Sequence, residues 1–290
     1  MQNLPSRLTA LAATLLLCGG LSAQTFEAGL MGGAAVYSGD LSPAEYGVFL
    51  EDVSAAGGAY LRFRPTQRLA LRVNAVYGRL QARRDRRVRN LNDEVVLVER
   101  NFRSKLVEYN LQAEFDLFYL GNPDGNYVAP YLYAGAGVLN FEPEGELDGT
   151  YYQLQPLATE GQGLGGPQYA SSRYDLSTAI GFLGVGIRGY FGDRITIGLE
   201  AGGRFTGTDY LDDVSDTRVN YLDIIGNTGA LAARFSNPAV DPADAAEDPN
   251  FQFTRGGDAN DYYFVGGLTL GISLGGGRGG RGGKTGCYQF

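Results

Sequence analysis

The sequence predicts an all-β protein: an eight-stranded antiparallel transmembrane β-barrel of the outer-membrane type, with short periplasmic turns and long extracellular loops. Three observations lead to this fold class. Segments of about ten residues alternate apolar and polar side chains, and this is the length that a tilted strand needs to cross hydrocarbon. The connections between these segments are short and long in turn. Past the first residues, no run reaches the roughly 18 apolar residues of a membrane-spanning helix.

The N-terminal residues have the pattern of a secretory signal peptide. Arg7 supplies the positive charge, residues 8–17 supply the apolar core, and small Ala23 precedes the expected cleavage site. A lipoprotein leader acylated at Cys18 is the alternative, which the two leucines before that cysteine disfavour. We therefore expect a signal peptide over residues 1–23, a barrel over residues 24–274 and a Gly/Arg-rich periplasmic tail over residues 275–290.

The clearest alternation lies in residues 106–117. Apolar side chains occupy the odd positions from Val107 to Leu117, and carboxylates or amides occupy the even positions from Glu108 to Asp116. A period of two sustained over this length is that of a β-strand, because a helix would scatter the carboxylates around its surface. Residues 68–78 and 195–208 show the same pattern.

Five weaker segments bring the total to eight, an even number as in other bacterial barrels of this type. Glycine and alanine blur the alternation in these segments, and the outward parity of residues 127–141 stays open. The five segments are residues 26–39, 56–64, 127–141, 176–191 and 262–274.

The lengths of the connections alternate along the chain. Short turns rich in Pro, Gly, Asn and Asp alternate with long connections, which is typical of a barrel that sorts its loops between two sides of a membrane. The short turns, and with them both termini, then face the periplasm. The short turns are residues 65–67, 121–126 and 192–194, and the long loops are residues 40–55, 79–105, 142–175 and 209–261.

Charged side chains on one face of a membrane strand indicate that this face lines the barrel interior, because a charge facing lipid at mid-depth costs about 2–4 kcal/mol. An eight-stranded barrel is just wide enough for its own side chains. We therefore expect a lumen plugged by ion pairs, and not a pore. The expected basic members are Arg62, Arg72, Arg188 and Arg204, and the expected acidic members are Glu108, Glu114, Asp116 and Glu200.

The composition argues against most classes of enzyme. The 290 residues include 44 glycines and 19 tyrosines but no histidine, which excludes an imidazole base, a Ser-His triad and a histidine-ligated metal. We expect no enzymatic activity, no cofactor, no metal and no small-molecule substrate. The formal net charge of −8 gives no general attraction to nucleic acid.

Two charged clusters in the long loops each have two interpretations. Asp209, Asp212, Asp213 and Asp216 either order their loop by turn and capping hydrogen bonds or hold calcium; the first is favoured because the spacing is not that of an EF-hand loop. A basic run either pairs with lipopolysaccharide phosphates or is simply solvated. This run consists of Arg79, Arg83, Arg84, Arg86, Arg87 and Arg89.

The tail has the composition of a flexible cationic tether that docks on an acidic partner. It ends its glycine-rich run in Gly-Lys-Thr, but Arg278 stands where a phosphate-binding loop needs its first glycine. Cys287 is the single cysteine outside the leader, so it is either free or paired between chains. The expected partner-binding residues are Arg278, Arg281, Lys284 and Cys287.

Four stretches of the chain match a known family pattern. Residues 200–215 read EAGGRFTGTDYLDDVS, residues 99–104 read ERNFRS, residues 154–163 read LQPLATEGQG, and residues 261–264 read DYYF. These stretches resemble the PorG-like outer-membrane barrels associated with the type IX secretion system. The most specific element of this family motif consists of Thr208, Asp209, Tyr210, Leu211, Asp212 and Asp213. The Gly/Arg tail and residues 237–248, which are rich in Ala, Pro and Asp, depart from the family pattern.

The resemblance implies a non-enzymatic barrel in the cell outer membrane that contacts the periplasmic ring of a type IX protein secretion machine. Its partners would be outer-membrane lipid, lipopolysaccharide and the ring proteins. The alternative is a structural or adhesive barrel similar to OmpA and OmpX, which binds lipopolysaccharide or surfaces through its loops.

Overall fold

The structure is a computed structural model that describes residues 25–43, 47–48, 50–122, 126–192, 194–244 and 248–274. Over these ranges eight long strands close into one antiparallel barrel, which confirms the predicted fold class. Around the ring they are β1 (Thr25–Ser38), β2 (Ser54–Arg64), β3 (Leu69–Arg89), β4 (Val95–Asp116), β6 (Tyr127–Leu147), β8 (Ser177–Phe191), β9 (Ile195–Thr206) and β12 (Tyr262–Ser273), which pairs with β1. The expected signal peptide and tail lie outside the described residues.

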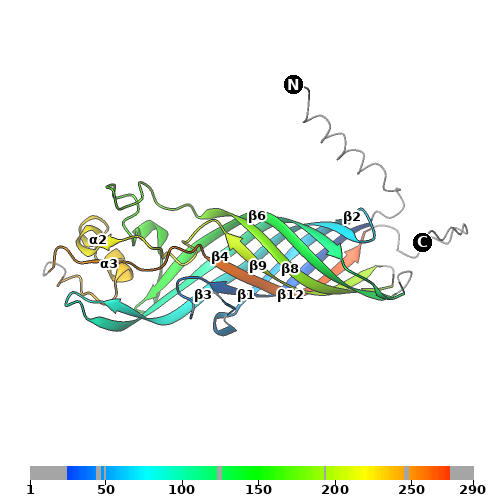
Figure 1. Ribbon diagram of the computed structural model, residues 1–290, viewed down its shortest axis with the longest axis horizontal. Coiled ribbons are helices and arrows are strands. Elements are labelled where there is room, and N and C mark those ends of the chain that lie inside the picture. Colours follow the sequence, from blue (N-terminus) through cyan, green and yellow to red (C-terminus); the bar gives the residue numbers. More distant parts are fainter. Residues whose placement is uncertain are drawn as a thin grey trace, which may run out of the picture.

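The strand register places the connections at two different ends of the barrel. Glu27, near the start of β1, lies opposite Ser273 at the end of β12 and opposite Arg62 near the end of β2. The connections β2–β3, β4–β6 and β8–β9 therefore lie at the end where β1 starts, and we call this the short-turn end. The short strand β5 (Leu120–Gly121) belongs to it. The opposite, long-loop end carries α2 (Tyr221–Asn227) and α3 (Ala230–Ser236), and the β3–β4 hairpin extends to the same end (Figure 1).

A belt of apolar side chains covers the outer surface of the strands. Alternate positions point outward, so Leu71, Val73 and Tyr77 of β3 are exposed while Ala70, Arg72 and Val76 between them are buried. An exposed apolar surface that continues around a barrel is stable only against hydrocarbon, and it indicates that the barrel spans a membrane. Other members of this apolar belt are Leu30, Leu61, Tyr109, Leu111, Phe115, Leu132, Val138, Leu183, Val185, Ile187, Ile197, Leu199, Phe205, Leu268, Leu270 and Ile272.

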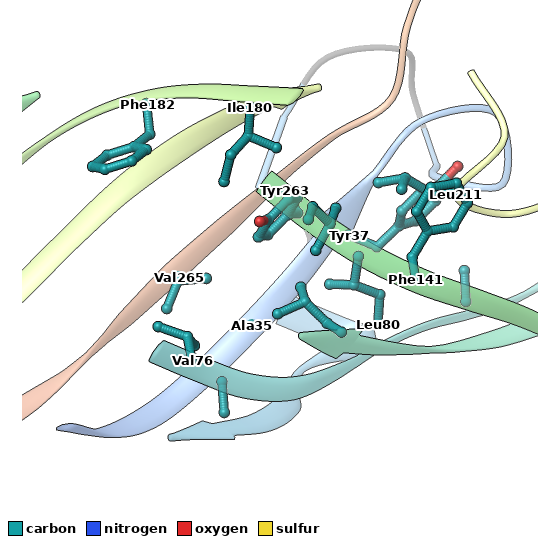
Figure 2. Close-up of a cluster of buried hydrophobic side chains, with 14 of the residues drawn as sticks. Ala35, Tyr37, Val76, Leu80, Phe141, Ile180, Phe182, Leu211, Tyr263 and Val265 are labelled. Atoms are coloured by element: carbon teal, nitrogen blue, oxygen red, sulfur yellow. The ribbon is translucent and has the colours of Figure 1, made fainter. Parts of the chain in front are cut away.

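Apolar side chains also fill the interior toward the long-loop end. Tyr37, Leu80 and Phe141 pack there with Leu211, which comes from the loop after β9 (Figure 2). Phe102 belongs to the same cluster. The cluster belongs to several strands and to a loop at once, so it ties the wall of the barrel to its long-loop end.

Glycines on the inward face of β8 make room for large side chains. The ring of Tyr131 lies where a Cβ at Gly186 would be, and the ring of Tyr133 lies where a Cβ at Gly184 would be. Both tyrosines come from β6, and their inward position settles the parity that the sequence leaves open for residues 127–141. Glycine is abundant in this strand because the narrow barrel is filled with tyrosine and arginine side chains. The residues opposite these large side chains have no space for a side chain of their own.

The expected long loop over residues 79–105 is wrong. Strands β3 and β4 continue through most of it and pair down to Arg89 opposite Val95, which leaves residues 90–94 as a tight turn. Inward positions such as Ala82 and Phe102 stay buried, but the outward positions of β3 from Arg79 onward are polar or charged. On β4 the outward positions 99–105 are polar or charged, and only Val95 and Leu97 near the turn are apolar. Inward and outward side chains therefore still alternate in this part of the hairpin, but water replaces lipid around its outer surface. The apolar belt ends there, although the two strands continue.

The polypeptide beyond the apolar belt at the long-loop end forms a folded unit, which we call the crown (residues 79–105, 142–176 and 207–261). It includes α2 and α3, whose side chains pack with Val219, Val240 and Phe253 into a core of their own. Among the described residues, no helix is long and apolar enough to cross a membrane. The remaining short elements are η1 (Leu50–Asp52) in the first long connection, and β7 (Thr150–Gln153), η2 (Gln155–Leu157), β10 (Val219–Asn220) and β11 (Gln252–Phe253) in the crown.

Candidate functional site

The barrel interior near the short-turn end contains a network of buried ion pairs. Glu114 of β4 is its centre: its carboxylate lies 3.0 Å from Nε of Arg62 and 3.4 Å from Nε of Arg72, and it also contacts Arg188. Arg62 and Arg72 lie directly opposite each other on β2 and β3. The carboxylate between them offsets a repulsion that would otherwise be severe inside a protein.

The network continues to both sides of Glu114. Arg72 forms a bidentate pair with Glu200, with N–O distances of 2.8 Å and 2.5 Å, and Tyr131 donates a hydrogen bond to Glu200 at 2.6 Å. Arg188 contacts Asp116 as well as Glu114. Bidentate and charge-assisted hydrogen bonds of this kind are the strong ones, and here they are shielded from water.

Arg204 and Glu108 form a separate pair closer to the long-loop end. Nε of Arg204 lies 3.7 Å from the Glu108 carboxylate, which accepts a hydrogen bond from Tyr263 at 2.7 Å. Together with the preceding contacts, this pair means that all eight side chains expected in the lumen lie in the barrel interior, each at most 3 % exposed.

Sequence reasoning missed two members of the interior network. Glu27 contacts Arg62, and Thr196 donates a hydrogen bond to Glu27 at 2.9 Å. Arg64 pairs with Asp116 at 2.8 Å. The same period of two would have found both, because Glu27 lies between outward Phe26 and Ala28 and because Arg64 follows Arg62 at the same parity. Counted over the described strands, the network is neutral: Arg62, Arg64, Arg72, Arg188 and Arg204 against Glu27, Glu108, Glu114, Asp116 and Glu200.

The mouth of the barrel at the long-loop end is closed by residues 209–216, which we call the cap segment. Leu211 is fully buried in the apolar cluster of Figure 2. The Tyr37 hydroxyl lies 2.6 Å from Asp212 and 3.0 Å from Asp261, and the Leu211 amide donates to Asp261 at 2.9 Å. The cap segment is therefore fixed to β1 and to Asp261, the residue before β12, by buried polar contacts as well as by packing.

Asp213 joins the cap segment to the crown residues Thr159, Tyr174 and Arg255. Its carboxylate accepts hydrogen bonds from Tyr174 at 2.7 Å and from Thr159 at 2.5 Å, and it lies 3.2 Å from Arg255. Its backbone φ of 66° is in the left-handed region, which costs a residue with a Cβ about 1–3 kcal/mol. These three contacts offset that cost.

Glu160 completes the polar core of the crown. It accepts hydrogen bonds from the Ser215 amide at 2.9 Å and from the Ser215 hydroxyl at 2.5 Å, and it lies 3.5 Å from Arg255. Burial raises the pKa of Glu160 to about 7, against the opposing effect of Arg255. Burial, with the negative charges of Asp40 and Asp212, raises the pKa of half-buried Asp209 to about 9.

Stretches that carry the family resemblance lie together in this region. Phe102 of the 99–104 stretch packs in the same apolar cluster as Leu211, and Glu160 accepts hydrogen bonds from Ser215 of the cap segment. The remaining motif residues contribute as well: the Tyr210 ring stacks on Tyr174 at 4.4 Å, and the main-chain oxygen of Thr208 accepts the amide of Asp261. The motif residues thus build the crown and the closure of the barrel.

The two interpretations of the aspartates in the cap segment can be compared with their contacts. Asp212 accepts the Val214 amide at 3.0 Å, and Asp213 accepts three side chains, as turn and capping residues do. Within the described ranges, no group of three or more His, Cys, Asp or Glu residues is arranged to hold a metal ion. The expected partner-binding residues Arg278, Arg281, Lys284 and Cys287 lie outside the described residues.

Comparisons with known proteins found similar folds among solved structures. No protein-family model and no curated protein matches the chain. The N-terminal β-barrel domain of OprF from Pseudomonas aeruginosa is 10 % identical, with 87 % of this chain and 97 % of that one covered and a TM-score of 0.34. Neisserial surface protein A is 12 % identical, with 86 % and 96 % covered and a TM-score of 0.37. Ail, the attachment invasion locus protein of Yersinia pestis, solved in complex with the heparin analogue sucrose octasulfate, is 10 % identical, with 87 % and 97 % covered and a TM-score of 0.31.

Proposed function

We propose that the chain is a non-enzymatic outer-membrane barrel that displays the crown outside the cell and binds lipopolysaccharide just below it. The short turns and both termini then face the periplasm. The observation that carries this proposal is a row of basic side chains on the outer surface of the barrel, directly beyond the apolar belt. Arg79 of β3 and Lys105 of β4 lie opposite each other in the register, one outward position past Tyr77 and Val107.

This row lies at the depth where lipid headgroups meet water. Aromatic side chains such as Tyr77 and Tyr109 mark the edge of the hydrocarbon in barrels of this kind, and both are more than half exposed. Arg79 is exposed and has no carboxylate partner within the described part of the chain, whereas Lys105 lies 3.1 Å from Glu142. Guanidinium groups bind phosphate by paired hydrogen bonds, so the free cation at this depth suits the phosphates of lipopolysaccharide.

Binding of labelled lipopolysaccharide to the detergent-solubilised chain tests this proposal. Replacing both Arg79 and Lys105 by Gln removes the two cations and is expected to weaken binding by about tenfold, since charge-assisted contacts to phosphate are lost. Replacing Arg173 and Arg234 by Gln makes the same change of charge in the crown and serves as the control. Equal affinity of the two double variants would contradict a role for the basic row.

A second candidate function is contact with the periplasmic ring of a type IX secretion machine. The resemblance of the family motif favours it, and the proposed contact residues are Arg278, Arg281, Lys284 and Cys287 of the tail. The motif residues themselves are less suited to contact the ring, because Leu211, Asp212 and Asp213 are buried at the end of the barrel opposite to the short turns.

Deleting the gene and measuring secreted cargo separates the two candidates, because only the ring anchor predicts a loss of secretion. Deleting residues 275–290 is then expected to reduce recovery of ring proteins with the purified barrel. Normal secretion in the deletion strain would contradict the ring-anchor function and favour lipopolysaccharide binding.

A further inference from the structure

A cavity of about 830 Å³ lies in the crown between the extended β3–β4 hairpin and the segment that follows β11. Residues 85–89 of β3 and Arg100 of β4 form one wall, and residues 252–256 with Arg218 form the other. The barrel mouth is closed by the cap segment and the interior network by its own ion pairs, so this cavity is separate from both. Its volume is within the usual range for sites that bind small molecules.

The lining of this cavity is strongly basic. Six arginines contribute to it in the part of the chain that the structure describes, namely Arg86, Arg87, Arg89, Arg100, Arg218 and Arg255, against two acidic residues, Asp40 and Asp85. The excess of positive charge is local, since the whole chain carries a net charge of −8. A concave surface lined by one sign of charge concentrates ligands of the opposite sign.

Most of these arginines are not neutralised by the protein. Arg255 is paired with Asp213 and Glu160, and Arg89 contacts Asp93. The other four, Arg86, Arg87, Arg100 and Arg218, have no carboxylate within ion-pair distance among the described residues.

Arg100 is the most informative of the four because it is only 8 % exposed. Its guanidinium donates to the main-chain oxygens of Arg255 at 3.2 Å and Ser236 at 3.1 Å, while its buried Nε has no partner. Burial and the nearby charge of Arg255 lower the pKa of Arg100 to about 9. The more distant charges of Glu160 and Asp212 oppose this shift. A buried cation with no carboxylate in ion-pair contact is unfavourable, and an anion in the adjoining cavity would stabilise it.

Two of the cavity arginines, Arg86 and Arg100, are held in position before any ligand binds. Arg86 and Arg100 lie on the same inward face of the hairpin, and Arg86 donates hydrogen bonds to the main-chain oxygens of Asp40 and Ser42. Contacts to carbonyl oxygens orient a guanidinium without cancelling its charge. Donors held in this way lose little conformational entropy when they bind an anion.

We propose that this cavity binds a phosphate or sulfate group, either as the free ion or as an ester on a sugar, with Arg86, Arg100 and Arg218 as its ligands. Guanidinium groups match the oxygens of such anions in pairs, and several of them compensate more than one negative charge. The remaining volume accommodates a group attached to the anion. The inference rests on the proposed function only in placing the crown outside the cell.

Calorimetric titration of the full refolded chain, in detergent free of lipopolysaccharide, tests this proposal. The probes are inorganic phosphate, inorganic sulfate, glucose 6-phosphate and uncharged glucose. We expect binding of the anions but not of glucose. Arg218→Gln and Arg100→Gln are each expected to weaken binding by about tenfold, and Arg173→Gln, an exposed crown arginine outside the cavity, is expected to leave it unchanged.

The arms of the experiment separate the sources of the anion. Tighter binding of glucose 6-phosphate than of phosphate supports the proposal with a sugar ester as the ligand, and equal binding supports it with the free ion. Absence of binding to the unaltered chain, or an equal loss in Arg173→Gln, overturns it. Folding of Arg100→Gln is checked by its electrophoretic migration before and after heating. If this variant does not fold, the result for Arg218→Gln, at an exposed position, tests the proposal.

Two further measurements keep this inference independent of the lipopolysaccharide proposal. The Arg79 and Lys105 double variant is expected to retain full binding of glucose 6-phosphate, and Arg218→Gln is expected to retain full binding of lipopolysaccharide. Loss of only one activity in each variant identifies two separate sites. Loss of both activities in both variants would overturn the separate cavity site.

Discussion

At the scale of single residues, the interior of the barrel depends on groups that compensate one another. Glu114 contacts Arg62, Arg72 and Arg188, and all four side chains are at most 2 % exposed. None of these cations can reach water when its partner is removed. The stability of the barrel is therefore more sensitive to these polar residues than to most of its apolar ones.

Replacing Glu114 by Gln tests this dependence. The variant keeps the shape of the side chain but leaves three buried guanidiniums with one negative charge fewer, so we expect the free energy of unfolding to fall by about 3–5 kcal/mol. Reversible unfolding by denaturant in lipid vesicles measures it. Glu142→Gln, which breaks the exposed pair with Lys105, is the control and should cost less than about 1 kcal/mol. Similar costs for the two variants would contradict the buried network.

Glu160, a buried carboxyl group of the crown, makes the crown sensitive to pH. Because the pKa of Glu160 is raised from 4.5 to about 7, the folded crown binds this proton more tightly than the unfolded chain does. The resulting stabilisation is fully present below about pH 4.5 and is lost as the pH rises through about 7, a loss of about 3 kcal/mol. We expect amide protection factors in residues 209–216 to fall over this range. Glu160→Gln should reduce the fall without abolishing it, because the pKa of Asp209 is also raised, to about 9. Protection that rises with pH would be the opposite of this result.

At the scale of elements, one strand crosses two environments. Outward positions of β4 are apolar between Tyr109 and Phe115 but polar at Glu99 and Asn101, while the inward positions remain buried through both parts. The period of two therefore reports the strand along its whole length, whereas the chemistry of the outward positions reports what surrounds it.

Two substitutions on β4 separate these environments. Leu111 is 55 % exposed in the apolar belt and Leu97 is 64 % exposed in the crown, so area alone does not distinguish them. We expect Leu111→Arg to cost about 2–4 kcal/mol of folding free energy in a bilayer, because the charge faces hydrocarbon. Leu97→Arg should cost almost nothing. Equal costs in vesicle refolding would place the membrane boundary elsewhere.

At the scale of the whole molecule, the barrel is closed twice, by the interior network near the short-turn end and by the cap segment at the other. The crown adds its own apolar core around Tyr221 and Phe253. These features describe a rigid support for an exposed surface, and they suit binding better than transport.

The closed lumen predicts the electrical behaviour of the purified protein. Since the side chains that fill the interior are almost completely buried, we expect no steady ion conductance in planar lipid bilayers. Stable, ohmic channels at low voltage would show that the interior network opens. A variant in which Arg188 and Glu114 are both replaced by Ala, which removes one of the largest side chains of the network and the carboxylate at its centre, is the comparison most prone to leak.

The predictions from sequence succeeded where local patterning controls the structure. Strand segments such as residues 106–117 were evident because lipid outside and charge inside enforce a strict alternation. The same alternation places Glu27 and Arg64 on the inward faces of their strands. Both could therefore have been predicted as members of the interior network. The prediction failed for residues 79–105, where arginines on the outward face suggested a loop although the inward positions continued the strand.

The cap and the basic cavity could not be predicted, because the contacts that build them join distant parts of the chain. Tyr37 meets Asp212 and Asp261 only after the barrel closes, and Arg100 meets Arg255 only after the crown folds over the hairpin. By itself, then, the sequence determined the barrel and the inward direction of its charges, since both follow from a repeat of two residues in a given solvent. Which charges find a partner, and which are left to face a cavity, was decided only by the tertiary structure, because pairing depends on distances across the fold that no local pattern contains.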